Sequence, residues 1–197
     1  MTRMQPLARE ALPDLEALLA PAQAVLGFIP NSLLTLARRP EILRAFAGLS
    51  RAVFAPGGIS PELKMLAAYI SSTAAGCRYC QAHSLKSAVL VGVPAEKVAS
   101  AWEFESHPGF SEAERAALRF ARDAALLPNA VTDAHFAALR RHFSDDQIVE
   151  LMAVIATMGW LNRWNDTMAT SLEPEPRALA ASVLAPRGWE PGKHGAC

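Results

Sequence analysis

The sequence predicts an all-α protein, because three observations agree. Apolar residues recur at helical spacing along most of the 197-residue chain, and no stretch sustains the polar–apolar alternation of a half-buried strand. Helix-start signals, in which a capping hydroxyl precedes proline or acidic residues, recur between these segments. Hydrophobic residues make up 51% of the chain and charged residues 19%, which is the composition of a folded domain with its own core.

Prolines and glycines divide the first half of the chain into five expected helices. Residues 56–58 read Pro-Gly-Gly, which is a clear break. Ser60, Pro61 and Glu62 then form a strong helix start, because the hydroxyl caps free amides, proline suits the first turn and the acid favours the helix dipole. The expected helices are residues 13–26, 31–36, 40–54, 61–75 and 77–91.

The second half contains two capping-box sequences, at residues 111–114 and 144–147, in which side chains at each end satisfy free backbone amides. Both boxes open long expected helices. Shorter helices are expected to begin at Pro94 and Thr132. The expected ranges are 94–105, 111–126, 132–141 and 144–169.

The composition of the chain shifts after residue 172. Residues 173–176 read Glu-Pro-Glu-Pro, which should stop the last long helix, and a short helix is expected at 177–185. A tail rich in proline and glycine follows. We therefore expect one all-helical domain over residues 1–172 and a C-terminal extension or tail over residues 173–197.

Charge and segment composition exclude two classes of partner. The chain has 19 basic and 19 acidic residues, so no basic excess is available to neutralise phosphates, and no nucleic-acid partner is expected. The longest uncharged run, residues 17–37, has the length of a membrane span but contains prolines and polar side chains that lipid disfavours. The N-terminus also lacks the apolar block of a secretory signal. We therefore expect no membrane contact and a cytoplasmic location.

The functional question centres on residues 76–83, which read Gly-Cys-Arg-Tyr-Cys-Gln-Ala-His. Cys77 and Cys80 form a Cys-x-x-Cys pair, His83 follows, and the only other cysteine is Cys197. Two such thiols can close a redox disulfide, share a metal ion or fill a core. In a reducing compartment a close pair is more often catalytic or metal-binding than a structural staple.

Electrostatics favour the redox use of the pair. A thiolate is the reactive form of cysteine, and Gly76 places the pair in the first turn of a helix, where partial positive charge helps a thiol lose its proton. On this ground alone Cys77, nearer the helix start, is the favoured nucleophile. His83 is one turn beyond Cys80, and a base beside two thiols is the minimal set for a dithiol cycle.

The other two uses are less well supported. Zinc requires four tetrahedral ligands, and structural sites usually provide a second paired motif. The spare candidate ligands are scattered singly: His107, His135, His142, His194 and Cys197. We therefore expect no metal and no bound cofactor, while inert core cysteines stay an alternative.

Two regions of the chain resemble a known family. Residues 59–64, Ile-Ser-Pro-Glu-Leu-Lys, and the Cys-x-x-Cys with its histidine resemble the AhpD-like alkylhydroperoxidase and carboxymuconolactone decarboxylase family. Residues 110–116 and 162–166 look like its subgroup of peroxidase-related proteins, and the resemblance covers about residues 30–172. It implies an all-helical homo-oligomer that reduces hydrogen or organic peroxides through a dithiol/disulfide cycle, with a thiol or dithiol as reductant.

The resemblance also implies a role for each site residue. The second cysteine of the family attacks the peroxide and the first resolves the product, which makes Cys80 the attacking thiol and Cys77 the resolving one. The family's proton relay uses a histidine and a glutamate at positions that here are Ser84 and Met65. His83 is the candidate substitute for the relay histidine.

Glu62, one turn before the Met65 position, is a candidate for the missing relay carboxylate. Two other functions stay open. The first is a lyase or isomerase of the carboxymuconolactone decarboxylase type with vestigial cysteines. The second is a non-enzymatic redox-sensing or interaction protein. Apolar helices at 61–75 and 148–161 indicate burial in a core or in an interface between subunits.

The end of the longest expected helix carries a polar cluster inside an apolar segment. Trp160 and Trp164 form one i,i+4 pair, and Asn162 and Asp166 form another. The plain interpretation is a packed tryptophan stripe beside a solvated polar face. The alternative hypothesis is that the polar cluster lines a pocket that faces the thiols.

Overall fold

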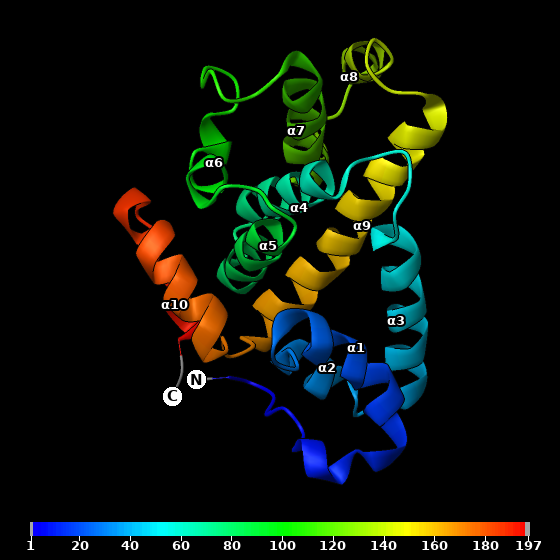
Figure 1. The fold of residues 1–197 in the computed structure, drawn as a ribbon, viewed down its shortest axis with the longest axis vertical. Coiled ribbons are helices and arrows are strands. Elements are labelled where there is room, and N and C mark those ends of the chain that lie inside the picture. Colours follow the sequence, from blue (N-terminus) through cyan, green and yellow to red (C-terminus); the bar gives the residue numbers. More distant parts are fainter. Residues whose placement is uncertain (1, 196–197) are drawn as a thin grey trace.

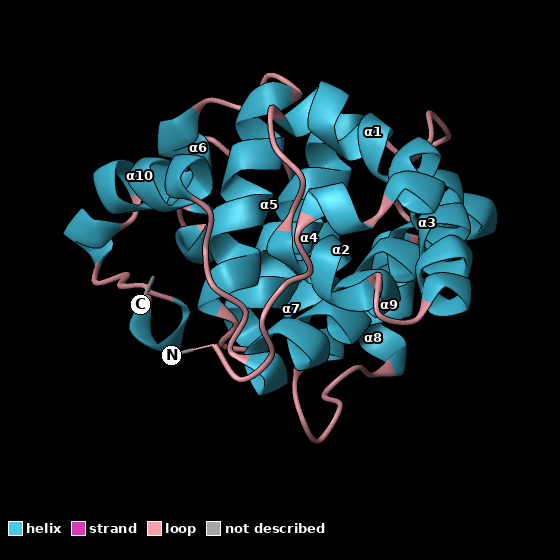
Figure 2. Ribbon diagram, turned by 90° about the horizontal axis from the view of Figure 1, so that it is seen from below, coloured by secondary structure: helices cyan, strands magenta, loops and turns pink. Residues whose placement is uncertain are grey.

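The computed structural model describes residues 2–195, and every regular element in that range is helical (Figure 2), which confirms the predicted all-α fold. The α-helices are α1 (Glu16–Leu26), α2 (Asn31–Leu36), α3 (Pro40–Phe54), α4 (Pro61–Ala74), α5 (Arg78–Leu90), α6 (Ala95–Ala99), α7 (Glu112–Ala125), α8 (Asp133–Leu139), α9 (Asp145–Met168) and α10 (Pro174–Val183). Short 3₁₀ helices are η1 (Arg9–Ala11), η2 (Pro13–Leu15), η3 (Ala101–Glu103), η4 (Ala185–Arg187) and η5 (Gly192–His194). Within residues 2–195, no helix combines the length and the apolarity that crossing a lipid bilayer requires.

The helix starts form as their capping residues predict. The hydroxyls of Ser60, Ser111 and Ser144 each accept a hydrogen bond from the amide three residues later, at 3.2, 3.2 and 3.3 Å. Two expected helices are more broken than predicted. The segment 13–26 begins with the 3₁₀ turn η2, and the segment 94–105 divides into α6 and η3.

Helix α4 lies at the centre of the molecule and packs against α5, α7 and α9 (Figure 1). Nearly all of its residues from Leu63 to Ser72 are buried, because other helices surround it on most sides. Leu66, Ala67 and Ile70 are at most 1% exposed. This explains the high apolarity of the 61–75 segment without an interface between subunits.

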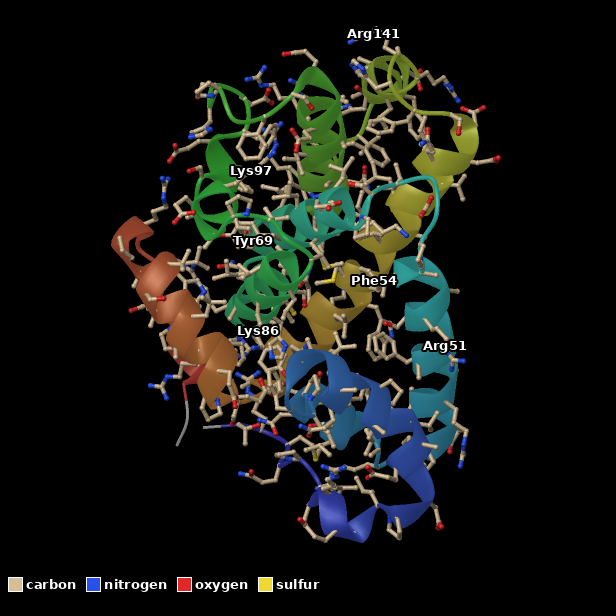
Figure 3. The ribbon with its side chains drawn as sticks, viewed as in Figure 1. Arg51, Phe54, Tyr69, Lys86, Lys97 and Arg141 are labelled. Carbon is tan, nitrogen blue, oxygen red and sulfur yellow. The ribbon has the colours of Figure 1, made fainter. Side chains whose placement is uncertain are left out.

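A second apolar cluster joins the N-terminal helices to α9. Its buried members are Leu12, Leu15, Leu19, Ile29, Leu36, Ala37 and Leu43, and Trp164 of α9 packs against them. On the neighbouring side the ammonium of Lys86, labelled on α5 in Figure 3, lies 5.7 Å from the ring centroid of Phe28. The Lys86 contact holds the loop between α1 and α2 close to α5.

The C-terminal segment packs on the domain, and one detail of its prediction is wrong. Helix α9 ends at Met168, and residues 173–176 begin α10 instead of interrupting a helix, because proline is well tolerated in a first turn. Helix α10 packs against α5. Ala180, Leu184 and Trp189 belong to the same buried cluster as α4. The segment after residue 172 therefore contributes to the core, as far as residue 195.

A buried lysine fastens the loop between α3 and α4. Lys64 is 2% exposed, and its ammonium lies 2.6 Å from Glu150 on α9. It also donates to the carbonyls of Val53 and Ala55, at 2.9 and 2.6 Å. The second Glu150 oxygen accepts from the amides of residues 58–59, at 2.8 and 3.1 Å. One ion pair thus provides hydrogen-bond partners for backbone groups on both sides of the turn at residues 56–58.

Replacing Lys64 by methionine is expected to lower the free energy of unfolding by about 3 kcal/mol, since two carbonyls and a carboxylate lose their partner. Chemical denaturation followed by circular dichroism measures the change. Arg51 is exposed and projects from α3 (Figure 3), so Arg51→Met serves as the control and should change stability by less than about 0.5 kcal/mol. Equal effects of the two substitutions would contradict a structural role for Lys64.

Candidate active site

Cys77 and Cys80 lie at the start of α5, which packs against α4 and α9. Gly76 has φ 73°, a left-handed conformation that favours glycine, and it turns the chain from α4 into α5. Cys77 is the N-cap of α5, and its Sγ accepts a hydrogen bond from the Cys80 amide at 3.3 Å. The two Sγ atoms are 2.9 Å apart and both thiols are free. A disulfide bond of about 2.05 Å therefore needs only a small further approach.

The two thiols differ in their surroundings although both are buried. Cys77 is 0% and Cys80 2% exposed. Burial raises the pKa of the Cys80 thiol well above its usual value, and the hydrogen bond and charge of Cys77 raise it further. The side-chain amide of Asn165, 3.5 Å from Cys80 Sγ, lowers this pKa by a smaller amount. In the reduced protein the Cys80 thiol therefore holds its proton at neutral pH.

His83 pairs with a carboxylate that the sequence did not single out. Its Nε2 lies 2.6 Å from Oε2 of Glu173, and its ring stacks on Tyr79 with centroids 4.2 Å apart. The Tyr79 hydroxyl donates to the other Glu173 oxygen at 2.9 Å. Burial raises the pKa of Tyr79 well above its usual value and the Glu173 charge adds to this, so the hydroxyl keeps the proton that it donates.

Glu173 itself is a buried carboxylate. Burial raises its pKa, but the charge and hydrogen bond of His83 and the backbone amide of Asn31 lower it more, so the net pKa lies below the usual value. Glu173 is the N-cap of α10, the helix that packs against α5. The sequence indicated only a helix stop here, and no local pattern pairs Glu173 with a histidine 90 residues earlier.

The other carboxylate considered, Glu62, does not reach the thiols. It is exposed in the first turn of α4, whereas Cys77 follows the last turn. With a rise of about 1.5 Å per residue, these two ends of α4 lie roughly 18 Å apart. Met65 is partly buried against the main core and Ser84 is buried. The family's relay positions therefore carry no proton-transferring pair in this chain.

A second histidine, His194, lies beside Cys77. It is 1% exposed in η5, and its Nδ1 lies 2.8 Å from the carbonyl of Thr170, so Nδ1 carries the proton and Nε2 presents its lone pair. The sulfur of Cys77, a ring nitrogen of His194 and a carboxylate oxygen of Asp166 all lie within 4.8 Å of one another. The second Asp166 oxygen is 2.7 Å from Lys193. The sequence did not predict this group, because its three residues are far apart in the chain and belong to no local motif.

The environment of His194 keeps its ring neutral. Burial lowers the pKa of His194, and the Thr170 carbonyl and Asp166 oppose that change only in part. Nε2 has no hydrogen-bond partner among residues 2–195. Buried polar groups are rarely left without a hydrogen-bond partner. The lone pair of Nε2 can therefore accept a proton or a hydrogen bond from a group that enters the site.

The polar cluster at the end of α9 faces the thiol region. Asn165 contacts Cys80, Asp166 lies near Cys77, and Asn162 donates to the Ser71 carbonyl at 3.4 Å. The tryptophans point to the other side: Trp160 and Trp164 stack with centroids 5.3 Å apart, and Trp160 stacks on Phe46 of α3. Asn162 and Asn165 are therefore buried on this face of α9, while Asp166 is partly exposed. A pocket in front of the thiols stays a hypothesis.

Comparisons with known proteins identify the family. The sequence model of the carboxymuconolactone decarboxylase family matches residues 40–123. No protein with a curated description matches the sequence. The debrominase Bmp8, solved as its C82A form in complex with 2,3,4-tribromopyrrole, is 39% identical over 93% of this chain and 98% of that chain, with a TM-score of 0.87.

Two further structures share the fold. An uncharacterized peroxidase-related protein with the alkylhydroperoxidase AhpD core, from Ralstonia eutropha JMP134, is 27% identical over 89% of this chain and 94% of that chain, with a TM-score of 0.79. An uncharacterized peroxidase-related protein from Silicibacter sp. TM1040 is 20% identical over 88% of this chain and 93% of that chain, also at 0.79, which supports the fold alone. This chain therefore belongs to the AhpD-like and carboxymuconolactone decarboxylase family, as its sequence motifs predicted.

Proposed function

We propose that this protein is a dithiol-dependent reductase, in which Cys77 and Cys80 are oxidised to a disulfide while a small electrophilic substrate is reduced. The 2.9 Å separation of the two sulfur atoms at a helix N-terminus carries this proposal. His83 is the proposed proton donor of the site. An external thiol or dithiol returns the disulfide to two thiols after each cycle.

A halogenated aromatic heterocycle is the substrate class that we favour. The supporting observation is the 39% identity to the debrominase Bmp8 over nearly all of both chains. In such a reaction a thiolate takes the halogen from carbon, the ring carbon gains a proton, and the second thiol displaces halide as the disulfide forms. The balance is one aryl bromide and two thiols giving one arene, one disulfide and hydrogen bromide.

A hydroperoxide is the second candidate substrate, and the Cys-x-x-Cys motif with its helical context supports it. The thiolate attacks the terminal oxygen and releases an alcohol, and the second thiol displaces water from the sulfenic acid. Two thiols and one hydroperoxide thus give a disulfide, an alcohol and water. Met65 and Ser84 stand at the family's relay positions, which makes this candidate the weaker of the two.

Turnover with both substrate classes tests the proposal. We expect the wild-type protein with dithiothreitol to release bromide from 2,3,4-tribromopyrrole, or to consume hydrogen peroxide or an organic hydroperoxide. Cys77→Ser and Cys80→Ser should each reduce the rate to background, because neither can complete a disulfide. Cys197→Ser, at a position outside the described residues, is the matched control and should retain the wild-type rate.

Two outcomes would replace the proposal. Normal turnover of a lactone or acid substrate after both Cys77 and Cys80 are changed to serine would indicate the lyase or isomerase function. Background turnover on every substrate, together with an oligomer size that changes between oxidised and reduced samples, would indicate a redox-sensing protein.

Glu173 is proposed to orient His83 for proton donation, and Glu173→Gln tests this role. We expect the turnover rate to fall about tenfold and its pH profile to change, since the amide cannot hold a protonated imidazole. Glu175→Gln, exposed in the first turn of α10, is the matched control and should leave the rate unchanged. An identical pH profile for wild type and Glu173→Gln would contradict the role.

Glu173 also predicts how stability depends on pH. Its folded-state pKa lies below the ordinary value of 4.5. Its ionised form therefore stabilises the protein above that value, and this contribution is lost as the pH falls further. The Glu173→Gln protein should show a smaller loss of stability on acidification, as measured by chemical denaturation across this pH range.

A homo-oligomer is part of the proposal, and exposed apolar side chains on the outer sides of α3 and α9 support it. They are Ile42, Leu49, Val149, Met152 and Trp160. Val149 is 70% exposed in the single chain. An acidic side chain at this position would be solvated in a monomer but buried and unfavourable in an interface between subunits. We expect Val149→Asp to dissociate the oligomer in sedimentation experiments, whereas Leu127→Asp, in the loop before α8, should not. An unchanged mass for Val149→Asp would place the interface elsewhere.

A further inference from the structure

The two thiols of the site are unequally prepared to become thiolates. Cys77 occupies the N-cap of α5, where its sulfur accepts the amide hydrogen of Cys80 and meets the positive end of the helix dipole. Cys80 lies one turn inside the helix. Its sulfur accepts a hydrogen bond from the side-chain amide of Asn165 at 3.5 Å. The local field therefore favours negative charge on Cys77.

A base is available beside Cys77. The hydrogen bond to the Thr170 carbonyl fixes the proton of His194 on Nδ1, so the lone pair of Nε2 is free inside the site. A ring nitrogen of His194 lies within 4.8 Å of Cys77 Sγ, a distance that one bridging water spans. His83, the other histidine of the site, is bound to Glu173.

From these contacts we infer that Cys77 is the attacking thiolate, that His194 is the base that receives its proton, and that Cys80 is the resolving thiol. The inference rests on the proposed dithiol function and reverses the order of cysteines that the family resemblance implies. It adds a C-terminal residue, outside the matched segment 40–123, to the catalytic set.

The sequence of steps balances. The Cys77 proton passes to His194 Nε2, and the Cys77 thiolate takes the halogen or the terminal peroxide oxygen of the substrate. The ring carbon or the departing alkoxide gains one proton. Cys80 then attacks Cys77 Sγ, which is 2.9 Å away, and halide or water leaves as the disulfide closes. Two electrons have moved from the two sulfurs to the substrate.

Cys80 becomes a better nucleophile only after Cys77 has reacted. The hydrogen bond and charge of Cys77 are two of the causes that raise the pKa of Cys80, and both disappear when Cys77 is converted to a sulfenyl halide or sulfenic acid. The amide of Asn165 then remains as a donor to the Cys80 sulfur. The pKa of Cys80 therefore falls once Cys77 has reacted.

The charged groups around His194 can stabilise its ring while the ring carries the proton taken from Cys77. Asp166 Oδ1 lies 3.6 Å from Nε2 and stabilises the imidazolium, while the second Asp166 oxygen pairs with Lys193 at 2.7 Å. That pairing offsets the repulsion between the Asp166 carboxylate and a thiolate at Cys77. Tyr79 of α5, with its ring centroid 6.0 Å from that of His194, is a neutral neighbour.

The test measures thiol reactivity in proteins that keep a single cysteine of the pair. Both start from Cys197→Ser, one adds Cys80→Ser and the other Cys77→Ser, and all samples are reduced and contain a chelator that removes metal ions from the thiols. Alkylation by iodoacetamide should be at least about tenfold faster at Cys77 than at Cys80.

The role of His194 is tested in the Cys77-containing protein. His194→Asn keeps a donor for the Thr170 carbonyl and removes the Nε2 lone pair, so it should slow alkylation about tenfold at neutral pH. His142→Ala, at an exposed position, is the matched control and should leave the alkylation rate unchanged. Thermal unfolding checks that the variant is folded, and His194→Gln is the second variant if the asparagine destabilises the tail.

Faster alkylation at Cys80 would overturn the assignment of the attacking thiol. An unchanged rate of Cys77 alkylation in folded His194→Asn or His194→Gln would overturn the assignment of the base. Because neither readout requires turnover, both remain decisive if no halogenated or peroxide substrate reacts. Failure of the proposed function and failure of this inference are therefore distinguishable.

Discussion

The carboxylate of Glu173 is the contact on which the geometry of the site depends. Its Oε1 accepts from the Asn31 amide at 2.5 Å and from the Tyr79 hydroxyl, and its Oε2 pairs with His83. One buried anion therefore joins the start of α2, the middle of α5 and the start of α10. A charge this deep is tolerated only because each oxygen has a partner, so the three segments must pack in one arrangement.

The same arrangement gives the site two proton-handling groups with different partners. The His83–Glu173 pair lies on the stacked face of Tyr79, whereas His194, Asp166 and Lys193 form a separate group near Cys77. A dithiol reduction needs a proton taken from the first thiol and a proton given to the product. Two histidines with different hydrogen-bond partners can divide these tasks, because one ring is paired with a carboxylate and the other is kept neutral by burial.

Local sequence signals were enough to predict the helices and the dithiol. Capping hydroxyls, prolines in first turns and Gly76 act within a few residues of where they stand, and the cysteine pair is a motif of four residues. Glu173 and His194 could not be predicted in this way. Their partners lie on distant segments, and the Pro-Glu-Pro context of Glu173 has a sufficient local explanation as a helix boundary. The substitution of Met65 and Ser84 at the family's relay positions was the one signal that proton-transferring groups had to come from elsewhere.

The positions of Glu173 and His194 in the sequence indicate how members of this family can differ in the reaction that they catalyse. The matched segment, residues 40–123, contains both thiols and His83, while Glu173 and His194 lie beyond it. A core that supplies the dithiol and His83, but neither Glu173 nor His194, leaves the proton chemistry open to change, and proton delivery to a ring carbon differs from delivery to an oxygen leaving group. The C-terminal segment contacts α5 through α10 and η5, and its core contacts come from other residues, Ala180, Leu184 and Trp189. Changes at Glu173 or His194 can therefore alter the proton chemistry while these core residues stay in place. The thiols are nearly fully buried, so a substrate can reach them only when part of their covering moves.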